Sequence, residues 1–284
     1  LYQLPPVVTS REEHEYLRET YGGVYFFNAP VLKKKKLKKV DLTKIFRQQG
    51  DKKFVSLLNN IRENSLTKED LLALNARRKN HDEKRGPAIV LATVNSIVDN
   101  INSQKLAQIK EKEYVFKASI EGDFDKKKSP GEMKLRLKKG AQIMMIKNDT
   151  KQVPRRWANG TLGVVEEIRK DYIAVRIGKE VCEIERATWD EMEYAFDPDD
   201  KIIERISKGS FIQYPIKLAW AVTIHKSQGK TFDRVIIDLG RGAFAHGQTY
   251  TAFSRCTTLD EIYLLRPVRF SDIILDREVE EFHA

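Results

Sequence analysis

The stretch of the chain most suited to chemistry spans residues 218–233 and reads LAWAVTIHKSQGKTFD. An apolar run typical of a buried strand is followed at once by Thr223, His225, Lys226 and Gln228. Several hydrogen-bond donors at the end of one strand suit contact with an anionic backbone. By residue type alone, the histidine would more often be structural and the lysine solvated, so only the pattern as a whole indicates a binding segment.

Two neighbouring stretches look like parts of a nucleotide site but are incomplete. Residues 229–231 read GKT, yet Ile224 stands where the pattern GxxxxGK[ST] needs its first glycine, so the backbone cannot wrap around phosphates. Residues 235–238 read VIID and resemble a magnesium-binding strand, but Leu239 follows where a second acidic residue would stand. A buried strand whose terminal aspartate caps the next turn is the favoured interpretation.

The charge balance favours a polyanionic partner. Lys and Arg number 51 against 41 Asp and Glu, which gives a formal net charge of +10 over 284 residues. Basic residues concentrate at 33–39 and 126–139, and acidic residues at 190–204 and 272–281. A solvated surface explains the run at 33–39 equally well. Nucleic acid is the leading partner, because no lipid-binding helix stands out.

Cysteine use and hydropathy bear on the compartment. Cys182 and Cys256 are the two cysteines, and neither has CxxC spacing or a histidine at metal-binding distance in the sequence, which argues against a disulfide framework and a metal site. The sequence has no apolar stretch of membrane-spanning length and no leader pattern. We therefore expect a soluble, intracellular protein without a membrane partner. The sequence begins with Leu1 and not with an initiator Met, which suggests that it is part of a longer chain.

Apolar periodicity predicts an α/β arrangement at both ends of the chain. A helix is expected over 11–21, and two more over 51–78 with a joint near Asn64. Their apolar faces are expected to contain Phe54, Leu57, Leu58 and Ile61, then Leu71, Leu72 and Leu74. A strand at 88–93 precedes a helical pattern from 97 to 106, and strands at 235–239 and 261–265 flank a helix at 247–255. This is the rhythm of a parallel sheet.

The middle of the chain has a different rhythm. Short apolar runs at 141–146, 161–168, 172–177 and 181–184 are separated by tight-turn residues. Closely spaced short strands of this kind predict a small antiparallel barrel. Because the α/β rhythm returns afterwards, the barrel is predicted to be an insertion within one α/β domain.

Four segments in a fixed order carry a resemblance to a known family. The stretch TIHKSQG resembles motif V of superfamily-one helicases of the RecD-like and Pif type. The opening LYQLPPVV resembles the end of motif III, residues 45–48 (IFRQ) resemble motif IV, and residues 248–256 (QTYTAFSRC) resemble motif VI. Motifs I and II, which hold the P-loop lysine and the magnesium-binding acids in that family, are absent from this sequence.

The resemblance implies a fold and its domains. The implied fold is an α/β, RecA-like parallel sheet with an inserted small antiparallel β-barrel that is similar to Src-homology barrels. Residues 1–46 would be the tail of a first RecA-like domain and a connector. Residues 47–130 with 212–284 would form the second RecA-like domain, and residues 131–211 the barrel.

The resemblance also implies a nucleotide site shared with another domain. Arg47 and Arg255 match the two arginines that reach the γ-phosphate, and a guanidinium offers fixed donors for its developing charge. Gln3 matches the glutamine that senses the γ-phosphate, and Gln228 and Gly229 would lie near the interdomain cleft. From residue types alone, Arg47 paired with Asp51 and Arg255 as a helix cap would be the favoured alternative.

DNA contacts are implied at two loops and in the barrel. Thr223, His225 and Lys226 would touch phosphates of a single strand, and Thr93 and Asn95 match the family's other backbone-contacting loop. These contacts fix position without reading sequence. In the barrel, cationic residues and Trp157 could grip or part the duplex: Lys147, Lys151, Arg155 and Arg156. A core position for Trp157 is the favoured alternative.

The implied function is that of the carboxyl-terminal motor portion of an ATP-dependent DNA helicase with 5′-to-3′ movement, in a family that serves DNA repair, recombination and telomere maintenance. ATP and Mg²⁺ would be held mainly by the missing N-terminal RecA-like domain, so this portion alone is expected to be inactive. Its partners would be that domain, single-stranded DNA and single-strand/duplex junctions. A non-catalytic nucleic-acid-binding module is the alternative, and a protein-docking scaffold is a weaker one.

Overall fold

A computed structural model describes residues 2–8, 10–34, 38, 40, 45–48, 50–79, 86–197 and 202–283. Most of the lysine run at 33–39 lies outside the described residues. The chain divides into two compact units. Unit 1 contains Leu1–Ile97 and Val222–Ala284, and unit 2 contains Val98–Ala221.

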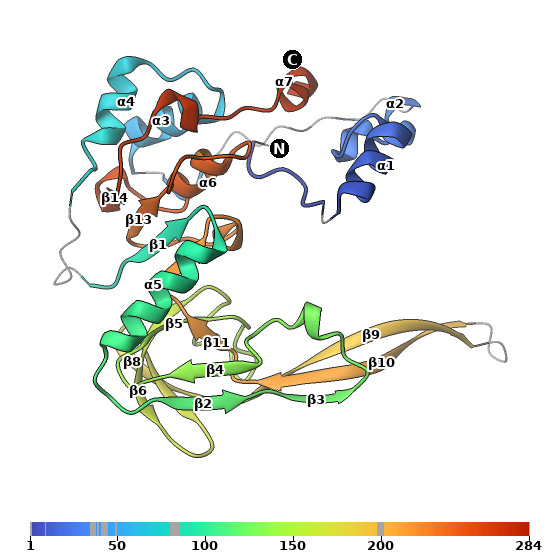
Figure 1. Ribbon diagram of the computed structural model, residues 1–284, viewed down its shortest axis with the longest axis vertical. Helices are drawn as coiled ribbons and strands as arrows, with labels where there is room; N and C mark the ends of the chain where they lie inside the picture. The colour runs from blue at the N-terminus through green and yellow to red at the C-terminus, as the bar shows by residue number, and fades with distance from the viewer. Residues whose placement is uncertain are drawn as a thin grey trace. The chain divides into compact units, whose positions relative to one another are not determined.

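Unit 1 is built on a four-stranded sheet with the order β12-β1-β13-β14 (Figure 1). Its strands are β12 (Ala221–Thr223), β1 (Ile89–Ala92), β13 (Val235–Asp238) and β14 (Ile262–Leu264). β13 pairs in parallel with both β1 and β14. The predicted α/β organisation with a parallel sheet is thus confirmed, and the ends of β1, β13 and β14 emerge at one edge.

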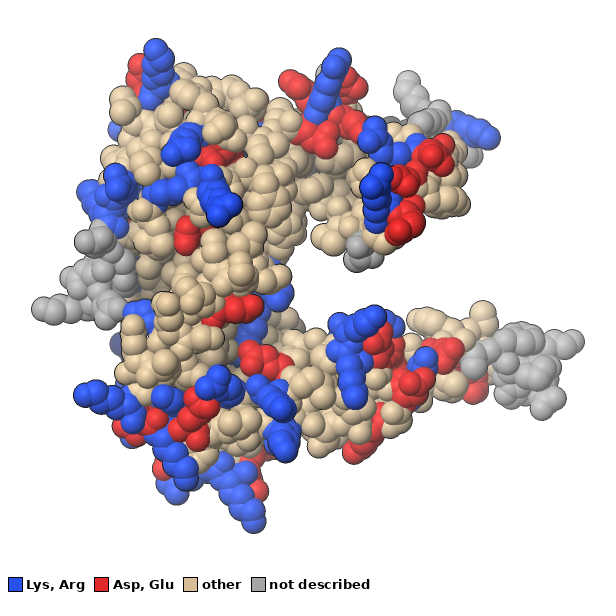
Figure 2. Space-filling view, in the orientation of Figure 1, with Lys and Arg blue, Asp and Glu red and all other residues tan. Residues whose placement is uncertain are grey.

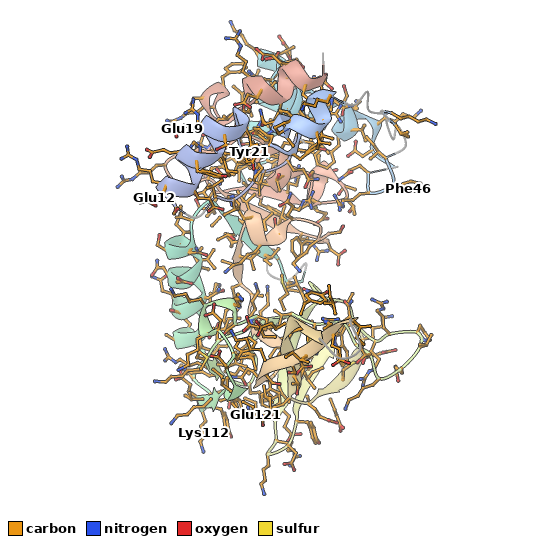
Figure 3. The ribbon with its side chains drawn as sticks, turned by 90° about the vertical axis from the view of Figure 1, so that its right-hand side faces the viewer. Glu12, Glu19, Tyr21, Phe46, Lys112 and Glu121 are labelled. Carbon is orange, nitrogen blue, oxygen red and sulfur yellow. The ribbon has the colours of Figure 1, made fainter. Side chains whose placement is uncertain are left out.

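The predicted helices of unit 1 form with local caps. α1 (Arg11–Tyr21) begins at Ser10, whose hydroxyl accepts from the Glu13 amide, and Glu12 and Glu19 lie at its surface (Figure 3). α3 (Lys52–Arg62) begins at Asp51, whose carboxylate accepts from the Phe54 amide at 2.9 Å. The expected apolar face of α3 is buried: Phe54, Leu57, Leu58 and Ile61.

The expected face of α4 (Lys68–Asn75) is wrong in one position. Leu74 is fully buried, whereas Leu72 is 71% exposed. Two residues along a helix turn the side chain by about 200°, so Leu72 and Leu74 cannot share a face. A hydroxyl cap at Thr67 and the left-handed backbone of Asn64 separate α3 from α4, near the predicted joint.

The other described elements of unit 1 are short helices. They are η1 (Phe26–Asn28), α2 (Pro30–Lys34), η4 (His225–Ser227), α6 (Gln248–Phe253), η5 (Leu259–Glu261), η6 (Phe270–Asp272) and α7 (Arg277–His283). α5 (Asn95–Gln108) follows β1. Five of the six residues of α6 are buried, so the segment that leads to Arg255 is part of the core.

Unit 2 contains mostly antiparallel strands. Five of them form a sheet with the order β11-β5-β6-β7-β8: β5 (Gln142–Met145), β6 (Leu162–Ile168), β7 (Ile173–Ile177), β8 (Glu180–Ile184) and β11 (Ile216–Leu218). All four pairings in this sheet are antiparallel. The buried core beneath it includes Leu135, Ile143, Val165 and Tyr214.

Unit 2 begins at Val98, earlier than the predicted insertion at residue 131. The reason is long-range pairing: β2 (Tyr114–Lys117) pairs with β4 (Lys134–Leu137), and β3 (Ser119–Gly122) pairs with β10 (Ile202–Gln213). η3 (Lys126–Lys128) lies between β3 and β4 in sequence.

The longest strands were not predicted. β9 (Ala187–Asp197) and β10 form a ribbon that extends past β3 (Figure 1). Acidic residues interrupt the apolar alternation that marks a half-buried strand. None of the described helices is both long and apolar enough to cross a bilayer.

Candidate nucleotide and nucleic-acid site

Arg47 and Arg255, far apart in sequence, contact the same short segments of unit 1. The Arg47 Nη1 group donates to the Ser254 carbonyl at 2.9 Å, and its Nε group donates to the Thr231 hydroxyl at 2.8 Å. The Arg255 Nη2 group donates to the Ser254 hydroxyl at 2.8 Å, and its Nη1 group to the Lys230 carbonyl at 3.4 Å. The two guanidinium groups therefore converge on one region.

The electrostatics of this region are unusual, because Arg255 is only 1% exposed. Burial, and secondarily the charge of Arg47, lowers the pKa of Arg255 to about 10, so the group stays cationic at neutral pH. Among the described residues, no carboxylate lies within salt-bridge distance of Arg47 or Arg255. A buried cation with a cationic neighbour is stabilised by an anion.

Of the two alternative roles, the structure shows the helix cap for Arg255 but no pairing of Arg47 with Asp51. Asp51 caps α3 through the Phe54 amide and contacts the Leu259 amide, while Arg47 binds Thr231 and Ser254. The Arg255 Nε group does donate back to the Thr251 carbonyl of α6 at 3.0 Å, as a helix cap would. That bond uses one of the five N–H groups of its guanidinium.

Gln3 forms a hydrogen bond with Gln228, which lies close in sequence to Lys230 and Thr231. Its Oε1 atom accepts from the Gln228 Nε2 group at 2.9 Å. Gly229, the next residue, has a φ of +76°, which a glycine adopts without strain. The structure thus brings together Gln3 and Gln228, which the sequence separates by most of its length.

A second set of predicted residues surrounds the ends of β1 and β12. Thr93 is buried directly after β1, and Asn95 is exposed at the start of α5. The buried Thr223 hydroxyl accepts from the Lys226 amide at 3.2 Å, while the Lys226 side chain is exposed. His225 is half-buried, and burial lowers its pKa. The exposed groups of this set are Asn95 and Lys226.

Comparison with known proteins shows that the chain is similar to DNA helicases. The chain matches no protein-family profile. It is 33% identical over 244 residues to the ATP-dependent DNA helicase Pif1 of Bdellovibrio bacteriovorus, a match that covers 82% of this chain and 51% of the relative. Over 238 residues it is 33% identical to the human ATP-dependent DNA helicase PIF1, with coverage of 80% and 34%.

Solved structures extend the likeness to the whole chain. The crystal structure of Bacteroides Pif1 in complex with ADP-AlF4 matches 100% of this chain and 64% of its own at 36% identity, with a TM-score of 0.82. Bacteroides Pif1 bound to ssDNA matches with the same identity and coverage and a TM-score of 0.74. The chain is related to the Pif-like DNA helicases. The resemblance stated from the motifs is thereby confirmed, and the chain spans about half of the first curated relative.

The two incomplete nucleotide motifs have structural explanations in this Pif-like chain. Thr231 of the GKT triplet accepts from Arg47, and no first glycine precedes it. Asp238 ends β13, and its carboxylate accepts from the Gly240 amide at 2.8 Å. The predicted cap at the end of this strand is confirmed.

Trp157 belongs to the core of unit 2 rather than to an open surface. Its side chain is 8% exposed, and the Arg156 guanidinium lies 4.4 Å from the centre of its ring. Arg156 in turn pairs with the buried Asp149 at 2.8 Å and holds the pKa of that carboxyl well below its usual range. The core alternative for Trp157 is confirmed.

Two of the other predicted cations of unit 2, Lys147 and Lys151, also have partners. The Lys151 ammonium lies 2.7 Å from Glu185, and the Lys147 ammonium donates to the Thr188 carbonyl and lies 5.0 Å from the Trp189 ring centre. Together with Arg156, they line a pocket of about 280 Å³. Arg155 is exposed.

Two residues of the site were not singled out from the sequence. Gln48 is buried, and its amide donates to the Cys256 carbonyl at 2.7 Å and the Ser254 carbonyl at 3.3 Å, which ties residues 45–48 to the Arg255 segment. Gly247, with a φ of +65°, passes close to the Tyr2 and Gln3 carbonyls. Gly247 could have been singled out from the sequence, because it is a glycine directly before motif VI.

Proposed function

We propose that this chain is the carboxyl-terminal motor portion of an ATP-dependent DNA helicase. Arg47 and Arg255 would supply positive charge to a nucleotide that a preceding RecA-like domain holds with Mg²⁺. On this proposal the chain alone does not hydrolyse ATP, because its sequence has neither a complete P-loop nor the acidic pair of motif II.

The convergence of Arg47 and Arg255 on Ser254 is the observation that carries the proposal. A fully buried guanidinium with a cationic neighbour, and no described carboxylate within salt-bridge distance, suits a polyphosphate as its counter-ion. The nucleotide supplies free energy through phosphoryl transfer. These side chains would bind its phosphates and offset charge on the transferred group.

Gln3 and Gln228 would report on the same nucleotide. An amide side chain can donate to an anion and accept from a donor, and the bond between the two amides provides two such groups at one place. Bacteroides Pif1 has been solved in complex with ADP-AlF4, which supports a nucleotide site in this fold.

Single-stranded DNA would bind at the ends of β1 and β12. Lys226 and Asn95 are the exposed groups there, while Thr93 and Thr223 shape the loops and His225 can donate as a neutral imidazole. Bacteroides Pif1 bound to ssDNA supports this assignment. Single-strand/duplex junctions would be the substrate of the whole protein.

We infer that residues 131–211, within unit 2, form the inserted small β-barrel, and that residues 47–130 with 212–284 form the second RecA-like domain. Support for the barrel comes from the five-stranded antiparallel sheet of unit 2 over a common core.

The decisive experiment measures DNA-stimulated ATP hydrolysis by the full-length protein with Arg255 changed. Arg255→Ala is expected to lower kcat by about 10³-fold or more, while nucleotide affinity stays within a few-fold. Arg255→Lys keeps the charge but loses the planar fork, and should also lose most turnover. Arg11→Ala, on the exposed face of α1, is the control. Unchanged turnover in both Arg255 variants would refute the assigned role.

A further inference from the structure

Tyr2, the residue before Gln3, is held by two side chains from other parts of unit 1. Its ring stacks on the His283 ring at 4.5 Å with an interplanar angle of 21°. The Arg62 guanidinium, at the end of α3, lies 5.1 Å from the centre of the same ring. Contacts of both kinds stabilise an aromatic ring in a defined orientation.

His283 lies on α7, and α7 is itself fixed to residues 25–28. The Tyr25 hydroxyl donates to Asp276 at 2.8 Å, and the Asn28 amide donates to Glu278 at 3.2 Å. The Phe27 ring stacks on Phe282 at 4.5 Å. These three contacts, none of which involves the nucleotide region, hold α7 and the residue before it against residues 25–28.

Gly247 provides the room that this arrangement needs. A Cβ atom at this position would lie 2.1 Å from the Gln3 carbonyl oxygen and 2.5 Å from that of Tyr2. The Gly247 amide donates to the Ile274 carbonyl at 3.1 Å, so the glycine is also bound to the segment that leads into α7. The backbone of Tyr2 and Gln3 is thus seated between α6 and the C-terminal segment.

We propose that Tyr2, Arg62 and His283 form an aromatic clamp that positions Gln3 against Gln228. The clamp residues are positioning residues, because they act through the orientation of Gln3. This inference rests on the proposed function, in which Gln3 responds to the nucleotide. It adds that the C-terminal helix α7 is required for the coupling of nucleotide turnover to DNA.

The test uses the full-length protein and compares Tyr2→Ala with Tyr2→Phe and His283→Ala. Loss of the ring contacts in Tyr2→Ala or His283→Ala should lower DNA-stimulated kcat by about tenfold. The KM for ATP and the thermal unfolding temperature should change little. Tyr2→Phe keeps the ring and should retain activity. Arg277→Ala, an exposed residue of α7 paired with Glu281, is the matched control.

A double-mutant cycle separates positioning from general damage. If Tyr2 acts through Gln3, the Tyr2→Ala/Gln3→Ala double variant should be no slower than Gln3→Ala alone. The clamp would be overturned if the losses of kcat in Tyr2→Ala and Gln3→Ala multiplied in the double variant, or if Tyr2→Ala kept full activity. If Arg255→Ala also leaves turnover intact, the proposed function fails as well. A loss in Arg255→Ala and Gln3→Ala without one in Tyr2→Ala overturns the clamp alone.

Discussion

At Arg255, burial and a neighbouring like charge act in the same direction, since both disfavour the cation. Its pKa falls to about 10 and remains above neutrality, so the charge is present in the native protein. The bonds to Thr251, Ser254 and Lys230 compensate part of the cost of burial. Such a residue is costly for a purely structural purpose, which is why it marks a site.

His225 should make stability dependent on pH. Burial lowers its pKa below the ordinary 6.5, so the unfolded chain binds more protons than the folded protein as the pH falls through that value. The free energy of unfolding should therefore decrease as the pH falls below about 6.5. His225→Gln should reduce this decrease, and the exposed His14→Gln should not. Thermal unfolding from pH 7.5 to 5.5 measures it, and identical slopes in all three proteins would contradict the prediction.

At the scale of elements, the site depends on short helices whose ends are defined by local bonds. Asp51 caps α3, and its own amide donates to the Gln48 carbonyl at 3.0 Å. The turn that carries Arg47 and the helix that carries Arg62 therefore meet at this residue. Caps of this kind are readable from sequence, because the donor and the acceptor lie three residues apart.

Asp51→Ala should destabilise unit 1 by about 1 kcal/mol, because the Phe54 amide loses its acceptor. Asp51→Asn retains an equivalent side-chain oxygen and should lie within a few tenths of a kcal/mol of the parent. Denaturant unfolding measures both values. Equal losses in the two variants would show that the charge of Asp51, and not its hydrogen bond, stabilises α3.

At the scale of the whole molecule, the net charge of +10 does not form one continuous basic patch on the face shown in Figure 2. Lys and Arg are interspersed with Asp and Glu over the face in Figure 2. Several cations of unit 2 are also engaged by carboxylates, including Lys128, Arg136, Lys151 and Arg156. On the proposed function, exposed cations next to the proposed DNA loops, such as Lys226, would contribute to the binding strength.

The affinity of the full-length protein for single-stranded DNA should fall with salt, with a log–log slope of about −0.7 per neutralised phosphate. Lys226→Ala should weaken binding to different sequences about equally and make the slope shallower by about 0.7. Lys179→Ala, at an exposed turn between β7 and β8, is the control. Fluorescence anisotropy across a salt series measures both slopes, and an unchanged slope for Lys226→Ala would remove it from the interface.

Short-range order could be derived from the residues. The helix α1, the buried face of α3, the parallel strands β1 and β13, and the cap at Asp238 follow from periodicity and from bonds between near neighbours. The order of four motifs likewise needs no coordinates, because it is a property of the chain. Leu72 shows the limit of such derivation. It is apolar but exposed, because the angular position of a residue around the helix axis decides its burial.

Contacts between distant residues were decided by the tertiary structure alone. The meeting of Arg47 with Ser254, of Gln3 with Gln228, and of Tyr2 with His283 joins segments separated by more than half of the chain. The burial of Trp157 and the ribbon of β9 and β10 were likewise set by partners that periodicity does not encode. The type of a side chain limits the bonds that a residue can make, whereas packing and the path of the chain determine which of these bonds form.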